Sequence, residues 1–194
     1  MTPTREQAYA LLTEHTKNPN LIKHALCVEA AMRRYARAYD GDVEAWAIAG
    51  LLHDFDYEEH PSLEEHPFVG AGILREQGYP EEIVEAILGH SDHTGVARTT
   101  QMARSLYAVD ELTGFIVACA LVRPSKSLLD LPVKSITKKF KDKAFCRAID
   151  RDHLRAAADE IELPLREHVE NVLGALQGIA AELGLDGGDA QSDG

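Results

Sequence analysis

Apolar residues recur every three or four positions along most of this chain, and the alternation typical of strands is absent. The pattern is clearest in the second predicted helix, which has apolar side chains at Leu21, Ala25, Val28, Met32, Tyr35 and Ala36. This spacing puts a single apolar stripe along one side of a helix. The sequence therefore predicts an all-α fold.

Local capping signals place the first three helices. Thr4 and Gln7 form a predicted capping box that begins a helix running to the turn at 18–20. Asn20 is expected to cap the second helix, and Asp42 the third, whose sequence is VEAWAIAGLL.

Turn residues and prolines bound the later helices. The predicted elements are a helix ending at Gly78, a helix from Pro80 to His90, a long helix from Thr100 to Val122, two short helices around Pro132, a helix beginning at Asp150, and a last helix from Leu163-Pro164 to Gly184.

A chain of 194 residues, 45% of them hydrophobic, can bury a substantial core in one domain. We expect a helical bundle over residues 1–185, with its core at about 20–123 and a basic and C-terminal helical extension at 124–185. The tail at 186–194, DGGDAQSDG, has no apolar residue except one Ala. It is expected to be disordered.

The formal net charge of −12 argues against binding to duplex nucleic acid, which needs Lys and Arg to neutralise phosphates. The charge is unevenly distributed, however. Residues 123–147 hold eight Lys or Arg against two Asp, a local charge of +6. This stretch could supply an anion site in an otherwise acidic protein.

The sequence has neither an apolar run of membrane-spanning length nor a recognisable signal peptide, so a cytoplasmic protein with no membrane partner is expected. The three cysteines, Cys27, Cys119 and Cys146, are odd in number and far apart. They form neither a disulfide framework nor a CxxC metal clamp, and core packing is their expected role.

Two imidazoles and two carboxylates occupy positions that are expected to face inward. His24 lies on the same side of its helix as the apolar stripe, and the pair His53-Asp54 closes an apolar helix. Asp110 lies on the inward side of the long helix, where an uncompensated carboxylate would cost several kcal/mol. A divalent cation supplies the compensation, and this N/O ligand set suits Mn, Fe, Zn, Ni or Co better than Ca.

The ordered set H…HD…D, with the pair inside LLHDFDYE and the last Asp inside YAVDELTGF, resembles the HD superfamily of metal-dependent phosphohydrolases. The similarity to HDIG-type bacterial proteins extends over roughly residues 5 to 180, through EEHPFVGAGIL, ILGHSDHTG, DELTGF and LVRPSKSLLDLPVKS. The resemblance implies an all-helical fold and hydrolysis of a phosphate ester, often of a nucleotide. It also implies a divalent metal, Mg among the candidates, held by His24, His53, Asp54 and Asp110.

The resemblance leaves the number of metal ions open. In binuclear members two further histidines hold a second ion and the Asp of the pair bridges, and His66 and His90 stand at those places. One subgroup has adjacent histidines at the second place, whereas here Ser91 follows His90 and His93 comes three residues on. The sequence LLHDFDYE also lacks the Ile-Gly that names the HDIG group.

The implied reaction uses a metal-activated water to cleave a phosphate mono- or diester, with a phosphorylated small molecule such as a nucleotide as partner. Asp54 would bind the metal and could orient the water, and His66 or His90 would be a second-metal ligand or a proton donor. Arg123 or Lys126 would offset charge on the phosphoryl oxygens.

Other interpretations stay open at this stage. The same polar residues could be a buried network bonded to one another, with His66 at a helix entry and His90 on a helix dipole. A few members of the HD superfamily bind two irons with the set H…HD…H…H…D and activate dioxygen. A nucleotide-binding regulatory module with little turnover is a third possibility, and a homodimer could form through the last helix. The remaining histidines, His15, His60, His153 and His168, are expected to be surface or ordinary packing residues.

Overall fold

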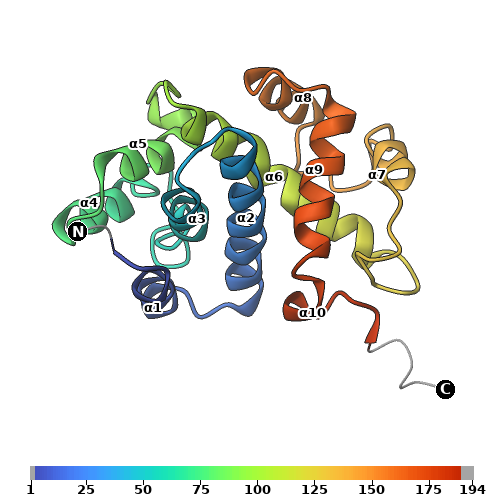
Figure 1. Ribbon diagram of the computed structural model, residues 1–194, viewed down its shortest axis with the longest axis horizontal. Helices are drawn as coiled ribbons and strands as arrows, with labels where there is room; N and C mark the ends of the chain where they lie inside the picture. The colour runs from blue at the N-terminus through green and yellow to red at the C-terminus, as the bar shows by residue number, and fades with distance from the viewer. Residues whose placement is uncertain (1–2, 189–194) are drawn as a thin grey trace. The chain divides into compact units, whose positions relative to one another are not determined.

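The computed structural model describes residues 3–188, and every regular element in that part of the chain is helical, which confirms the all-α prediction. The elements are α1 (Arg5–His15), α2 (Pro19–Ala38), α3 (Val43–Leu52), α4 (Phe68–Glu76), α5 (Glu81–Gly89), the 3₁₀ turn η1 (Asp92–Thr94), α6 (Gln101–Leu121), α7 (Val133–Lys139), α8 (Arg151–Glu160), α9 (Leu165–Gln177) and α10 (Ala180–Leu183) (Figure 1). Of the tail predicted at 186–194, residues 189–194 lie outside the described part.

The predicted starts of α1 and α3 are confirmed, and that of α2 is wrong. Thr4 and Gln7 form a reciprocal capping box, and the Asp42 carboxylate accepts hydrogen bonds from two backbone N–H groups of α3. The cap of α2 is Asn18 rather than Asn20. Pro19 explains the difference, because proline fits the first helical position, where its missing N–H costs nothing.

Two predictions for the second half of the chain are also wrong. Between 124 and 150 the structure has only α7, which begins after Pro132, so the two short helices predicted around that proline reduce to one. The last helix is broken after Gln177 at Gly178, and α10 follows it. Glycine is a poor helix former, so Gly178 favours an end to the helix at this position.

The contacts divide the chain into two compact units, Met1–Tyr107 and Ala108–Gly194, with the division inside α6. In the first unit α3 is the central element and packs against α1, α2 and α5. Its residues from Trp46 to Leu52 are all buried, which fits its lack of a polar side. Because α3 is buried in the middle of this unit, the chain segment that follows its last residue begins inside the unit.

In the second unit α7 and α8 pack against α9. The Phe115 ring lies against the rings of Phe140 and Phe145, with centroids 4.7 and 5.5 Å apart. These contacts tie the loop that follows α7 to α6. No helix in the described part of the chain is long and apolar enough to cross a membrane.

Candidate metal centre

Four histidines of the first unit surround the carboxylate of Asp54. His53 continues helical geometry one residue past α3, with φ −59° and ψ −34°, and Asp54 follows it in a turn. His24 lies in the first half of α2, His66 stands two residues before α4, and His90 caps the C-terminus of α5. Four separate segments therefore converge on one side chain.

Each oxygen of Asp54 faces its own set of imidazoles. Its Oδ2 lies 3.3 Å from Nε2 of His53 and 3.9 Å from Nε2 of His24. Its Oδ1 lies 3.2 Å from Nε2 of His66 and 3.3 Å from Nε2 of His90. Ligand atoms within each set lie within 4.8 Å of one another, so each set could hold a metal ion, with Asp54 common to both.

Backbone hydrogen bonds fix which ring nitrogen of two histidines can bind a metal. Nδ1 of His53 lies 2.8 Å from the Gly50 carbonyl, and Nδ1 of His90 lies 2.5 Å from the Ile87 carbonyl. A carbonyl only accepts, so Nδ1 carries the hydrogen in both rings and Nε2 keeps its lone pair. Both Nε2 atoms face Asp54, which is the orientation a ligand needs.

A buried carboxylate orients the third ring. Asp56 is only 1% exposed, and its Oδ1 lies 2.7 Å from Nδ1 of His66. Its Oδ2 accepts a 2.7 Å hydrogen bond from the backbone N–H of Gly70 in α4. With both oxygens of Asp56 in use as acceptors, Nδ1 of His66 carries a hydrogen, and Nε2 is the nitrogen that points at Asp54.

The arrangement fits a cation. Nε2 of His53 and Nε2 of His90 each lie 3.3 Å from an oxygen of Asp54, and because a carboxylate only accepts, a proton or a metal ion has to lie between the two atoms of each pair. Burial alone would raise the pKa of Asp54, yet His53, His66 and His90 hold it well below its usual range. Burial likewise opposes protonation of His66, but hydrogen bonds to Asp54 and Asp56 raise its pKa to about 9. Divalent ions replace such protons when they bind.

The centre is open on one side. The side chains of His24 and Asp54 are 23% and 24% exposed, whereas His53 is fully buried. Ligands on this side can therefore be reached by water and by a substrate.

The other predicted site residues belong to neither metal set of the first unit. Asp110 belongs to the second unit, and its role as a ligand stays a prediction. In that unit, Arg123 donates a 3.1 Å hydrogen bond to the carbonyl of Asp130 and pairs with its carboxylate at 3.3 Å. Lys126 is exposed, with a left-handed φ of 46°. His93 bonds to Ser91 and to the His66 carbonyl, and it belongs to neither metal set.

The family model of the HD domain matches residues 21–114. The chain contains an HD domain. All six residues of the predicted set, from His24 to Asp110, lie within the matched part. The HD superfamily consists largely of metal-dependent phosphohydrolases, so the domain agrees with the ligand geometry.

Two relatives are similar to about half of the chain. An uncharacterized protein of Methanocaldococcus jannaschii is 33% identical over 106 residues, which are 52% of this chain and 60% of the relative. Ribonuclease Y of Nitratidesulfovibrio vulgaris is 30% identical over 96 residues, 49% of this chain and 18% of the relative. The chain thus spans less than two thirds of either relative. No solved structure matches it at a significant level.

Sequence reasoning missed Asp56. It stands two residues after the pair, in LLHDFDYE, and helical periodicity cannot mark a residue in a turn. The available signal was a second acidic residue directly after Phe55, two positions from Asp54.

Proposed function

We propose that this protein is a metal-dependent phosphohydrolase that cleaves a phosphate mono- or diester of a nucleotide-like substrate, and that Asp54 would help to hold two divalent ions. One observation carries the proposal. The two oxygens of Asp54 face separate pairs of histidines, and each set could hold an ion.

Each residue of the centre would have a separate role in binding the ions or the water. His24 and His53 would hold one ion and His66 and His90 the other, with Asp110 as a further ligand. When bound, such ions lower the pKa of a water molecule and polarise a phosphoryl oxygen. Asp54 would also orient the attacking water from its partly exposed side, while Asp56 keeps a hydrogen on Nδ1 of His66, so that Nε2 is the nitrogen available to an ion.

The chemistry of the substrate follows from the ligands and from one relative. Histidine and carboxylate ligands without thiolate suit Mn, Fe, Zn, Ni or Co, and a two-ion site suits in-line displacement at phosphorus. The name ribonuclease Y indicates cleavage of RNA phosphodiesters by that relative, and it supports including short oligoribonucleotides among the candidate substrates. Arg123 already holds Asp130, so Lys126 is the better candidate for contact with a phosphate.

The same two-ion arrangement favours one alternative. A di-iron oxygenase of the HD superfamily would use His24, His53, Asp54, His66, His90 and Asp110. The first five of these residues make up the two groups that could hold an ion. Iron-dependent oxygen uptake with an organic substrate, and no phosphate release, would identify that activity. Tight nucleotide binding with no turnover under any divalent ion would instead indicate a regulatory module.

The test combines elemental analysis with a phosphate-release screen across nucleotides, dinucleotides and short oligoribonucleotides. The wild-type protein should hold two ions per chain and hydrolyse at least one substrate class. Asp54→Ala should remain helical by circular dichroism but lose both ions and turnover, because both sets share this residue. His90→Gln should lose only one ion. Asp42→Asn, a conservative change at the start of α3, serves as a control. Retained turnover in Asp54→Ala would rule out the mechanism.

A further inference from the structure

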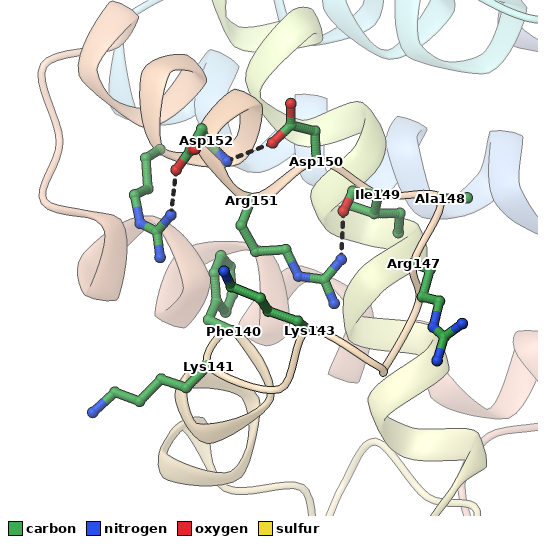
Figure 2. A pocket seen from close by; sticks show the side chains of 10 residues that line it. Phe140, Lys141, Lys143, Arg147, Ala148, Ile149, Asp150, Arg151 and Asp152 are labelled. Atoms are coloured by element: carbon green, nitrogen blue, oxygen red, sulfur yellow. Dashed lines mark hydrogen bonds and ion pairs between the residues drawn. The ribbon is translucent and has the colours of Figure 1, made fainter.

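A basic cleft lies in the second unit, between the loop that follows α7 and the start of α8. Its volume is about 600 Å³. The lining residues all fall between 140 and 155 (Figure 2). Five are cationic, Lys141, Lys143, Arg147, Arg151 and Arg155, and two are acidic, Asp150 and Asp152. The lining therefore carries a charge of +3 in a protein whose net charge is −12.

One of these cations holds the cleft together. The Arg151 guanidinium donates to the backbone carbonyls of Phe145, Cys146 and Ile149, the bond to Cys146 being 2.6 Å long. It also lies 5.0 Å from the centre of the Phe115 ring. Arg151 thus fixes the loop that carries the other cations.

The two carboxylates of the lining are already in use. Asp150 caps α8 by accepting a 2.8 Å hydrogen bond from the backbone N–H of Asp152. The Asp152 carboxylate pairs with Arg155 at 2.7 Å. Neither carboxylate is therefore bonded to a lysine of the cleft.

Three cations remain for a ligand. Within residues 3–188, the side chains of Lys141, Lys143 and Arg147 make no hydrogen bond or ion pair. In Figure 2, Lys141 and Arg147 lie on opposite sides of the view, with Lys143 between them. Like charges held on one short loop repel one another, and a bound anion relieves that repulsion.

We propose that this basic cleft binds an anion carrying two or more phosphate groups. Ligand sites commonly have volumes of about 300–1,000 Å³, so the cleft can hold a ligand of nucleotide size. Guanidinium and ammonium groups are the usual partners of phosphate oxygens, and several cations spread along one loop suit more than one phosphate. None of the lining residues belongs to the histidine and aspartate cluster, so the proposal does not depend on turnover at that cluster.

The test is isothermal titration of the full-length protein with pyrophosphate, and separately with ADP, at about 0.15 M salt, where charges more than roughly 8 Å apart are screened. Both titrations are run with and without EDTA, which removes binding through a metal ion. The pocket variant is Lys143→Gln combined with Arg147→Gln. The matched control is Lys134→Gln combined with Lys138→Gln, which removes the same charge from exposed positions of α7 outside the cleft.

Binding should persist in EDTA, weaken at least tenfold in the pocket variant and change less than twofold in the control. Tighter binding of ADP than of pyrophosphate would identify an organic phosphate as the ligand, and equal binding an inorganic one. No binding of either anion in EDTA would overturn the proposal, and so would equal weakening in both double variants.

Discussion

Replacing Asp56 by Asn tests whether a buried carboxylate sets the protonation of a metal ligand. The change keeps the size of the side chain but turns one of its two acceptor oxygens into an N–H donor. If the remaining oxygen stays with the Gly70 N–H, the new amide donates to Nδ1 of His66. The proton of His66 then moves to Nε2, the atom that faces Asp54. A protonated Nε2 cannot bind a metal.

The opposite orientation of the Asn side chain is also unfavourable. Its N–H group would face the Gly70 N–H, leaving two donors against each other in a place where Asp56 is 1% exposed. Loss of a partner that orients a metal-bound histidine typically lowers affinity about 10–100-fold, equivalent to about 1.4–2.8 kcal/mol. That loss should be confined to the ion held by His66 and His90.

Competition titrations with a chromophoric chelator measure both affinities in one experiment. As the chelator concentration rises, Asp56→Asn should first lose the ion held by His66 and His90. The ion held by His24 and His53 should stay bound. Asp42→Asn, the same isosteric change at the start of α3, should leave both affinities unchanged. Two ions bound to Asp56→Asn with affinities within twofold of wild type would refute the proposed role.

Three further predictions concern stability and metal content. Gly70→Ala should lower metal affinity, because the new Cβ would lie 2.8 Å from Cγ of Asp56. Gly72→Ala, on the same helix, should leave metal affinity unchanged, because its Cβ would meet no atom within 4 Å. Chelator competition on the two variants measures both effects. Lowering the pH from 7.5 to 5 should cost about 2 kcal/mol of unfolding free energy through His168, because burial holds its folded pKa at about 4 while the unfolded chain takes up a proton below about 6.5. Urea unfolding of His168→Gln should show a correspondingly smaller pH effect, and an unchanged one would contradict this account. EDTA should lower the melting temperature of the wild type, since an ion at 100 times its Kd adds about 2.7 kcal/mol, but not that of Asp54→Ala.

The sequence determined the helical class and most helix boundaries, because these depend on local spacing and capping. The apolar stripe of α2, the Asp42 cap and the fully apolar α3 could each be read from neighbouring residues. For the same reason, the pair His53-Asp54 could be placed at the end of a buried helix. The cap of α2 was predicted at Asn20, but the structure has it at Asn18, because Pro19 takes the first helical position.

Only the tertiary structure decided how the centre is organised. From the sequence, His66 and His90 could be either metal ligands or ordinary residues at helix ends. The packing of α3 against α5 brings His90 to Oδ1 of Asp54. The role of Asp56 depends on a turn that brings it to His66, ten residues away, and to Gly70 in the next helix. Periodicity describes which side of a helix is buried, but hydrogen-bond geometry between separate segments arises only when the chain folds.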